Sequence, residues 1–372
     1  MTSIRHDGRV AEIDVMLDDL STLVNVESPS RDLEALAASA SALSTMIEQR
    51  LGSVPTLIDT AAGPMVHWVG GGSPKVLIVG HHDTVHPLGV LAERPFTVAD
   101  GRATGPGVFD MKGGIVQAIH AIASLADRSG IEMLWTADEE VGSLASVDFL
   151  SARAIACGAV LVLEPAGDNG ALKIARKGVG TFEVRIHGRA SHAGLEPEKG
   201  VNALVEAAHQ VLIINSLGQP DIGTTVTPTV ARIGTTDNVV PALAELLIDV
   251  RVESAAEKDR LETAMALLTP HDPQTRIEVR GGLNRPPMPA SASEWLFPIA
   301  ETVASDLGWD ITGIAVGGGS DGNFTAALGV ATLDGLGAVG GGAHSEKEHL
   351  IVDEMPRRSA LLAGIITAIQ HR

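Results

Sequence analysis

The chain has 372 residues, 45% of them hydrophobic and 20% charged, a composition typical of a globular protein with room for two domains. Its net charge of −19 and the lack of any Lys/Arg-rich run argue against nucleic acid or an anionic membrane as a partner. Cys157 is the single cysteine, so no disulfide can form within the chain. No stretch reaches the ~18 apolar residues that span a bilayer, and the first residues do not resemble a signal peptide, so we expect a cytoplasmic protein.

The first part of the chain alternates helical and strand-like patterns. Apolar residues spaced by three or four positions predict helices over residues 10–24, 33–51 and 112–126. Short apolar runs predict strands at residues 65–69, 76–79, 131–136 and 159–163. The pattern returns later, with helices expected at residues 294–306 and from 356, and strands at residues 311–316 and 330–333. This alternation predicts an α/β fold with a doubly wound, largely parallel sheet.

The middle of the chain has a different pattern. Strand-like alternation and helical stripes follow one another in the order β-α-β-β-α-β, which is the order of the ferredoxin-like unit. The strands are expected at residues 178–188, 225–233, 244–252 and 275–280, and the helices at residues 201–212 and 256–268. We therefore predict a discontinuous catalytic domain of residues 1–176 and 287–372, into which a second domain of residues 177–286 is inserted.

Histidine and acidic residues stand where the predicted strands end. His81 and Asp83 follow the strand at residues 76–79, and Asp110 lies in a glycine-rich turn. The other members of this set are Glu139, Glu140, Glu164 and His344. Because ligands bind at the carboxyl ends of the strands in such sheets, we expect these side chains to converge. Gathered carboxylates repel one another without cations, and this mixture of nitrogen and oxygen ligands suits a pair of divalent ions such as zinc.

Taken one at a time, these residues also have simpler interpretations. Asp110 could cap the helix that follows it, since Asp is common in that role. The neighbouring glutamates at 139 and 140 could form a solvated acidic turn, and Glu164 could be a strand-end charge. We interpret three further histidines as loop residues or supports of the site: His82, His86 and His349. Four others lie within predicted elements and are expected in the core or on the surface: His67, His120, His187 and His209.

Five motifs occur in order along the chain: GHHDTV, GPGVFDMKGG, DEEVGS, LEP and GGGAHS. Together they resemble the co-catalytic zinc exopeptidases of peptidase clan MH, and within that clan the glutamate carboxypeptidases of the carboxypeptidase G type. The resemblance implies two zinc ions, one held by His81, Asp110 and Glu164 and the other by Asp110, Glu140 and His344. Cobalt or manganese would suit the same ligands nearly as well.

The same resemblance implies the supporting roles. Glu139 would be the general base and acid, and Asp83 would orient His81. The resemblance also implies a cis peptide bond between Asp110 and Met111.

The segment GRASHAGLEPEKG resembles the start of the dimerisation domain of this family, which makes the insert a dimerisation domain, or lid. The resemblance implies a homodimer in which His192 reaches into the partner's active site and holds the substrate carbonyl oxygen. It further implies that Asn238, Arg251, Arg285 and Gly318 bind the substrate. A guanidinium fork suits a terminal carboxylate, the role implied for Arg285. Arg251 could instead be an ordinary charge at a strand end.

These assignments predict a hydrolase that cleaves a C-terminal amide bond and releases a free amino acid such as glutamate. A water between the two ions would lose its proton to Glu139 and attack the carbonyl. The substrate is expected to be a small peptide or an N-acyl amino acid. The alternative is an N-acyl amino acid deacylase of the acetylornithine or succinyl-diaminopimelate type, which would need the same catalytic residues.

A serine hydrolase is a more distant alternative. Residues 318–322 fit the G-x-S-x-G pattern of a nucleophile elbow, with Ser320 as nucleophile and His344 or His349 as base. This alternative leaves the acidic residues at the other strand ends unexplained. The turn around Asp110 does not fit a dinucleotide fingerprint, because the aspartate occupies the position of the last glycine.

Overall fold

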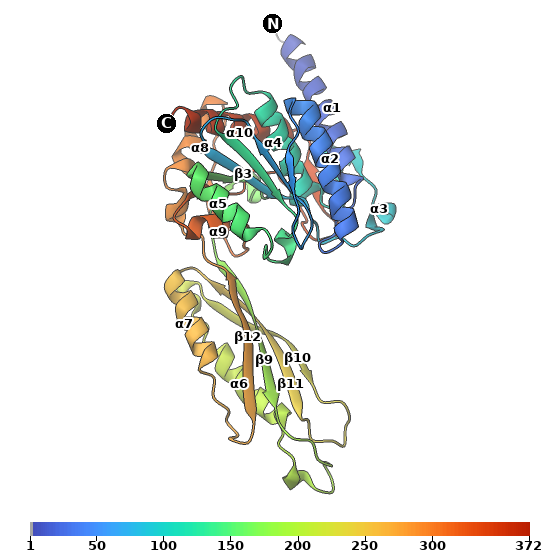
Figure 1. The fold of residues 1–372 in the computed structure, drawn as a ribbon, viewed down its shortest axis with the longest axis vertical. Helices are drawn as coiled ribbons and strands as arrows, with labels where there is room; N and C mark the ends of the chain where they lie inside the picture. The colour runs from blue at the N-terminus through green and yellow to red at the C-terminus, as the bar shows by residue number, and fades with distance from the viewer. Residues whose placement is uncertain (1–2) are drawn as a thin grey trace. The chain divides into compact units, whose positions relative to one another are not determined.

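The computed structural model describes residues 3–372, with side chains from residue 12 onward. The chain forms two compact units (Figure 1). Unit 1 contains Met1–Ala175, Ala290–Val316 and Ser320–Arg372, and unit 2 contains Arg176–Pro289 and Gly317–Gly319. Each unit has a hydrophobic core of its own, and each is described separately below.

The main sheet of unit 1 has six strands in the order β1-β2-β6-β3-β7-β14. Their bounds are β1 (Thr56–Ile58), β2 (Met65–Val69), β3 (Val76–His81), β6 (Ile131–Thr136), β7 (Ala159–Val162) and β14 (Ala331–Leu333). Strands β6, β3, β7 and β14 run parallel, whereas β1 and β2 are antiparallel additions at one edge. The predicted α/β class with a largely parallel sheet is therefore confirmed.

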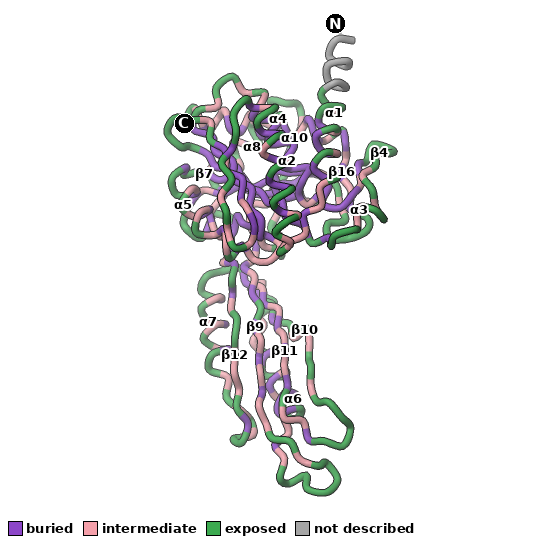
Figure 2. The backbone as a smooth tube through the Cα atoms, turned by 45° about the vertical axis from the view of Figure 1, so that its right-hand side comes forward, coloured by how far each residue is buried: buried purple, intermediate pink, exposed green. Residues whose placement is uncertain are grey.

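Helices cover both faces of this sheet. One core cluster contains residues of α1 (Ser3–Val24), α2 (Leu33–Leu51), α4 (Gly113–Ala123), α8 (Leu296–Asp306) and α10 (Glu354–Gln370). A second cluster contains residues of α5 (Val147–Cys157), with a residue of α9 (Gly322–Ala327) packed against it. Val76 and Ile78 of β3 belong to the first cluster, and Leu77 and Val79 to the second. Figure 2 shows the buried interior that results, which explains why β3 is a continuous apolar run.

Smaller elements surround the sheet. They are α3 (Val90–Glu93), β4 (Thr97–Ala99), β5 (Arg102–Thr104), β8 (Leu172–Arg176), β13 (Gly313–Val316), β15 (Gly340–Gly341) and β16 (His349–Ile351). Strands β15, β16, β5 and β4 form a separate sheet in that order, and β13 pairs with β8. The strand predicted at residues 311–316 thus exists in part, but it lies outside the main sheet.

Unit 2 has a four-stranded antiparallel sheet with two helices. The elements follow in the order β9 (Gly178–His187), α6 (Ala203–Asn215), β10 (Thr225–Ile233), β11 (Leu243–Val252), α7 (Ala255–Ala266) and β12 (Arg276–Arg285). The strand order is β10-β11-β9-β12, which leaves β10 at an edge. Alternate residues of β11, from Ala244 to Val252, are buried in one core with α6 and α7. The period-two alternation of the sequence therefore reflects a sheet with one covered face.

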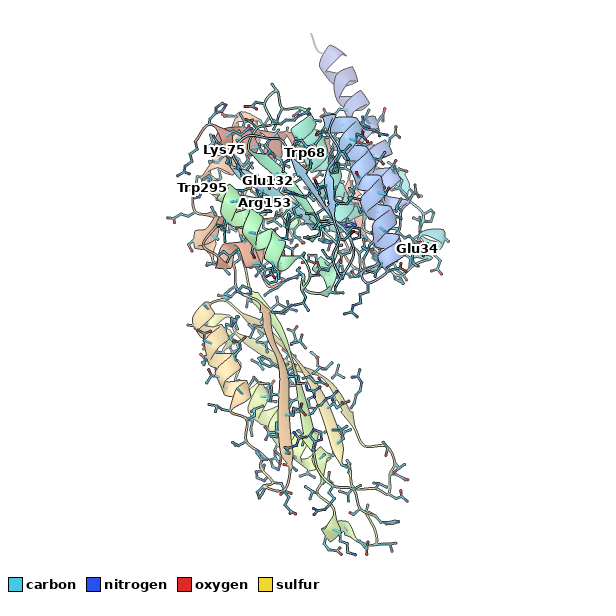
Figure 3. All side chains as sticks on the ribbon, viewed as in Figure 1. Glu34, Trp68, Lys75, Glu132, Arg153 and Trp295 are labelled. Carbon is cyan, nitrogen blue, oxygen red and sulfur yellow. The ribbon has the colours of Figure 1, made fainter. Side chains whose placement is uncertain are left out.

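Glu132 on β6 joins three elements of unit 1 through one buried carboxylate. Its Oε2 lies 2.8 Å from His67 Nε2 on β2 and 2.7 Å from Arg153 Nε on α5 (Figure 3). Arg153 also donates to Oε1. Burial would raise the pKa of Glu132, but the hydrogen bonds from Arg153 and His67 outweigh it and lower the pKa below its ordinary value.

Glu132→Gln is expected to lower the free energy of unfolding at pH 7 by about 1.5–3 kcal/mol, the range for hydrogen bonds to charged groups. Because the folded pKa is depressed, this stability is present above the unfolded pKa of ~4.3 and is lost as the pH falls through the folded pKa. Urea unfolding should therefore show the difference from wild type shrinking below about pH 4. Glu34→Gln, at an exposed position of α2, is the control. A difference that stays constant down to about pH 3 would contradict this assignment.

Candidate metal centre

The first part of the site lies where β3 ends. His81 Nδ1 is 2.9 Å from the main-chain oxygen of Asp83, and a carbonyl oxygen can only accept, so Nδ1 carries a proton. The other ring nitrogen, Nε2, lies 3.3 Å from Asp110 Oδ1 and 3.6 Å from Glu164 Oε1. His81 therefore presents Nε2 to two carboxylates, which is the arrangement of a metal-ligating histidine whose second nitrogen is held by a backbone carbonyl.

The second part shares Asp110 with the first. The other carboxylate oxygen of Asp110, Oδ2, lies 3.3 Å from His344 Nε2, and Glu140 Oε1 lies 3.2 Å from the same nitrogen. In each of the two triads, one ligand atom per residue lies within 4.8 Å of the others. The structure thus brings together all five residues that the sequence analysis expects as metal ligands. It also has the expected cis peptide bond between Asp110 and Met111.

Two carboxylate oxygens of the site, which accept no hydrogen bond from any described residue, fit a cation. Asp110 Oδ1 and Glu140 Oε1 are buried, and neither accepts a hydrogen bond from any residue in the described part of the chain. Buried carboxylate oxygens usually have a hydrogen-bond partner, so two without one in the same cluster are unusual. Imidazole nitrogens and carboxylate oxygens in three-ligand groups are the donor set that zinc prefers. The residues present therefore fit one divalent ion in each triad.

The electrostatics of the site point the same way. Burial raises the pKa of Asp110, but the imidazoles of His344 and His81 outweigh it and hold that pKa well below its usual range. Conversely, contact with Asp110 and then Glu140 raises the pKa of His344 to about 10. Burial lowers the pKa of His81, yet Asp110 and Asp83 outweigh it and raise that pKa. The carboxylates therefore draw positive charge to this position, as they would toward a divalent ion.

Asp83 supports the site in a way that the sequence did not indicate. Its carboxylate is fully buried and accepts hydrogen bonds from Ser30 Oγ at 2.7 Å and from the main-chain N–H groups of Glu139 and Glu140, both at 3.2 Å. The same carboxylate is 3.5 Å from His81 Nδ1, farther than the main-chain oxygen of Asp83. Burial raises the pKa of Asp83, but His81 and Ser30 outweigh it and lower that pKa. Asp83 therefore anchors the turn that carries both glutamates, while its carbonyl holds the imidazole.

The simpler interpretations of the acidic residues are wrong. Helix α4 begins after Lys112 with no side-chain cap, so Asp110 does not cap it. Glu139 begins a 3₁₀ helix, Glu139–Val141, and is only 6% exposed, so the turn is not solvated. Glu164 is 8% exposed, which also excludes a surface charge.

The other histidines have ordinary roles. His82 is buried between Ser39 Oγ and the carbonyl of Pro64, and burial lowers its pKa to about 4. His67 contacts Glu132 as described above, and His120 lies 2.7 Å from Asp19. His209 on α6 stacks on His271. His86 is the exception, because it contacts a buried glutamate that the sequence analysis did not single out.

The residues expected to bind substrate lie on unit 2. They are His192, Asn238, Arg251, Arg285 and Gly318. His192 is exposed, and its Nδ1 accepts hydrogen bonds from the N–H groups of Gly194 and Leu195, so a neutral ring carries its proton on Nε2. A β-bridge between His192 and Val239 places Asn238 on the neighbouring segment.

Two arginines of unit 2 contact the carbonyls of the glycine loop. Arg251 forms a bidentate pair with Asp249, at 2.9 and 2.8 Å, and its Nη1 lies 3.4 Å from the oxygen of Gly317. Arg176 Nη1 lies 3.2 Å from the oxygens of both Gly318 and Gly319. Sequence reasoning missed Arg176, because nothing in the local pattern indicates a contact with a loop that follows far along the chain. The substrate-binding roles themselves stay predictions.

Ser320 does not have the setting of a nucleophile. Its side chain is fully buried, its Oγ donates to Asp334 Oδ2 at 2.6 Å, and the same Oγ accepts the N–H of Gly322 at 3.1 Å. Among the residues that the structure describes, no histidine forms a hydrogen bond with it. A triad requires a histidine base at this position, so the serine-hydrolase alternative is rejected.

Known proteins are similar to this chain over most of its length. Carboxypeptidase G2 of Pseudomonas sp. (strain RS-16) is 33% identical to this chain over 373 residues, covering 94% of this chain and 88% of the relative. Succinyl-diaminopimelate desuccinylase of Azoarcus sp. (strain BH72) is 28% identical over 354 residues, covering 87% of this chain and 91% of the relative. Both alignments extend through unit 1 and unit 2.

Solved structures share the fold. The aminopeptidase PepT from Bacillus cereus ATCC 10987 aligns with a TM-score of 0.78 at 22% identity, covering 96% of this chain and 99% of that one. The M20 family metallo-carboxypeptidase Sso-CP2 from Sulfolobus solfataricus aligns with a TM-score of 0.76 at 17% identity, covering 97% and 99%. These similarities show a common architecture.

In the described residues, no helix combines the length and the apolar character needed to cross a membrane.

The family profile covers most of the chain. Residues 77–368 match the profile of peptidase family M20/M25/M40, a span that includes both ligand triads. With this match and a relative at 33% identity over nearly the whole chain, the protein belongs to the M20/M25/M40 family of metal-dependent peptidases.

Proposed function

We propose that the protein is a di-zinc exopeptidase that cleaves the C-terminal amide bond of its substrate and releases free glutamate. One observation carries the proposal: two histidine–carboxylate triads share Asp110, and a buried glutamate that belongs to neither triad, Glu139, adjoins the ligand Glu140. Such a centre needs a proton acceptor that is not itself a ligand, and Glu139 meets that requirement.

The chain's own residues would divide the chemistry. When bound, two divalent ions would lower the pKa of the attacking water and polarise the amide carbonyl. Glu139 accepts the proton of that water and returns it to the leaving amine. The carboxylate of Asp83 keeps Glu139 in place by accepting the main-chain N–H of Glu139. His192 of the partner subunit offers the Nε2–H of its ring as a donor to the carbonyl oxygen, where negative charge develops.

The proposal includes a homodimer in which His192 of the partner subunit completes each site. Two features of unit 2 support it. Helix α6 exposes four large apolar side chains, Leu204, Val205, Leu212 and Ile213. Strand β10 is one of the two edge strands of the sheet, so its outward N–H and C=O groups can pair with another chain. A second copy of unit 2 would cover both features.

Arg285 is proposed to bind the terminal carboxylate of the substrate. Arg285→Lys keeps the charge but loses the planar fork, so the KM for a glutamyl substrate should rise by about 10- to 100-fold while kcat changes less. Steady-state kinetics on a glutamyl amide measure both constants. Arg280→Lys is the matched control, because Arg280 is an exposed arginine on the same strand. An unchanged KM in the Arg285 variant would show that Arg285 does not bind the substrate.

A second function is favoured by one of the relatives. The succinyl-diaminopimelate desuccinylase removes an acyl group, and it is 28% identical to this chain. A deacylase would use the same triads and the same base, and would differ in which side of the amide is recognised. The carboxypeptidase comes first because the carboxypeptidase relative is the more similar of the two, at 33%.

A substrate panel distinguishes the two functions. The zinc-loaded protein is assayed with benzoyl-glutamate, N-acetylornithine and N-succinyl-diaminopimelate. Benzoyl-4-aminobutyrate, which lacks only the α-carboxylate of benzoyl-glutamate, is the matched control. Release of glutamate from the first substrate, without cleavage of the control, supports the carboxypeptidase. Preference for the short acyl substrates would assign the protein to the deacylases instead.

A further inference from the structure

A buried glutamate outside the two triads contacts the loop that carries Asp110. Glu348 is 3% exposed and lies four positions after His344, just before β16. Its Oε1 accepts the N–H groups of Phe109 and Asp110, both at 3.0 Å. Its Oε2 accepts the N–H of Gly107 at 3.0 Å. One carboxylate thus holds three main-chain N–H groups of the turn that presents the shared ligand.

The turn is shaped for this contact. Gly107 has a φ of +72°, and a Cβ added there would lie 2.7 Å from Thr84 Cγ2, so only glycine fits without movement. The resulting backbone directs successive N–H groups to one side, which is the geometry of an anion-binding concavity. Glu348 supplies the anion from within the chain.

Strand pairing explains how Glu348 reaches the turn. His349 of β16 is opposite Thr104 of β5 in an antiparallel register. The residue before His349 therefore lies beside the residues that follow Thr104, where the Asp110 turn begins. The small sheet β15-β16-β5-β4 thereby brings the loop of His344 against the loop of Asp110.

His86 and Arg94 close the network. His86 Nε2 lies 2.7 Å from Glu348 Oε2, and Arg94 Nη2 lies 3.3 Å from His86 Nδ1. Because arginine only donates, Nδ1 must accept, and the proton of the ring is on Nε2, where it is donated to Glu348. Arg94 Nη1 lies 3.1 Å from the main-chain oxygen of Ser345, the neighbour of His344. One connected set of hydrogen bonds therefore joins the loop of Asp110 to the loop of His344.

A general stabilising role does not account for this arrangement. Burying a carboxylate is costly, and a well-packed apolar residue would often stabilise the fold as well or better. The carboxylate instead fixes the position of particular backbone atoms, two of them in Asp110 and its neighbour Phe109. His344 itself has a φ of +61°, an uncommon conformation that its surroundings must maintain.

We propose that Glu348 is a positioning residue of the metal centre, which fixes Asp110 relative to His344 before metal binds. The inference rests on the di-metal function proposed above. It assigns to Glu348 no contact with metal or substrate; its effect passes through the turn at residues 107–110. Loss of such an outer partner typically lowers metal affinity by about 10- to 100-fold.

Zinc affinity is the test, measured by competition with a chromophoric chelator on the full chain. Glu348→Gln replaces one acceptor oxygen with an N–H group that faces backbone N–H groups, so zinc should bind about 10- to 100-fold more weakly than to wild type. Glu346→Gln is the matched control, because it removes the same charge from an exposed position of the same loop. Its zinc affinity should equal that of wild type.

If Glu348→Gln does not fold, two variants of its partner His86 test the same hydrogen-bond network. His86→Ala removes the donor to Oε2 and should also weaken zinc binding, whereas His86→Gln restores an N–H group at that end and should recover the affinity. A folded Glu348→Gln or His86→Ala variant that binds two zinc ions as tightly as wild type would overturn the positioning role and leave the proposed function intact. If the wild-type protein binds no zinc, the proposed function fails, and this inference fails with it.

Discussion

Glu139→Gln is expected to lower kcat by about 10²- to 10⁴-fold, the range for loss of a general base, while the metal content stays at the wild-type value. The side-chain amide of glutamine has the size of the carboxylate. The substitution leaves the main-chain N–H of residue 139, which Asp83 accepts, unchanged, so the turn should be preserved. The amide cannot accept the proton of the attacking water. Steady-state kinetics and elemental analysis of the purified protein measure the two quantities.

Glu140→Gln is the control for Glu139→Gln, because it changes a metal ligand instead of the base. Glu140 lies 3.2 Å from His344 Nε2 within the second triad, so Glu140→Gln should lose metal together with activity. The two variants differ by one position and remove the same charge. If Glu139→Gln loses metal as well, Glu139 is a ligand rather than the base. If it retains wild-type turnover, it has no part in the chemistry.

Asp110→Ala is expected to lose both metal ions. Each oxygen of Asp110 faces a different triad, so removing the side chain takes a ligand from both. The loss of affinity should exceed the ~10- to 100-fold that removal of an outer partner costs. Elemental analysis after dialysis against low-affinity buffer gives the number of ions that each chain retains.

Single-triad variants are the controls for Asp110→Ala. Glu164 belongs only to the first triad and His344 only to the second. Glu164→Ala and His344→Ala should therefore each weaken the binding of one ion and leave the binding of the other unchanged. Retention of one tightly bound ion in Asp110→Ala would show that the aspartate is not shared.

Much of the fold was predictable from local sequence patterns. The strands at residues 65–69, 131–136 and 225–233 have the predicted bounds, because each is a short β-prone run between turn or polar residues. The sequence pattern does not predict helix α5: its buried residues are Leu150, Ala154 and Cys157, but Ile155 is also apolar and is 61% exposed, so the apolar residues do not form one clear helical stripe. The alternating pattern predicts a strand at residues 311–316 in the main sheet, but β13 pairs with β8 instead, and this pairing depends on contacts between distant segments.

The ligand set was also accessible from the sequence, for a physical reason. The parallel strands β3, β6 and β7 end at one edge of the sheet, so His81, Glu140 and Glu164 meet there. Asp110 and His344 lie in loops of the smaller sheet, and their place in the ligand set came from the motifs that carry the family resemblance. The supports of that set were not accessible in the same way. Asp83 accepts main-chain N–H groups more than 50 positions away, and Glu348 accepts N–H groups about 240 positions away. A main-chain N–H has no sequence signature, so contacts of this kind become visible only in the fold.

A metal titration of activity measures how many ions the catalytic centre needs. The protein is stripped with a chelator, dialysed, and assayed on benzoyl-glutamate as zinc is returned in measured equivalents per chain. We expect no glutamate release from the stripped protein and full recovery of release once two equivalents are bound. Glutamate release that survives removal of the metal, or that is complete with no second ion bound, would contradict a centre built on two triads that share Asp110.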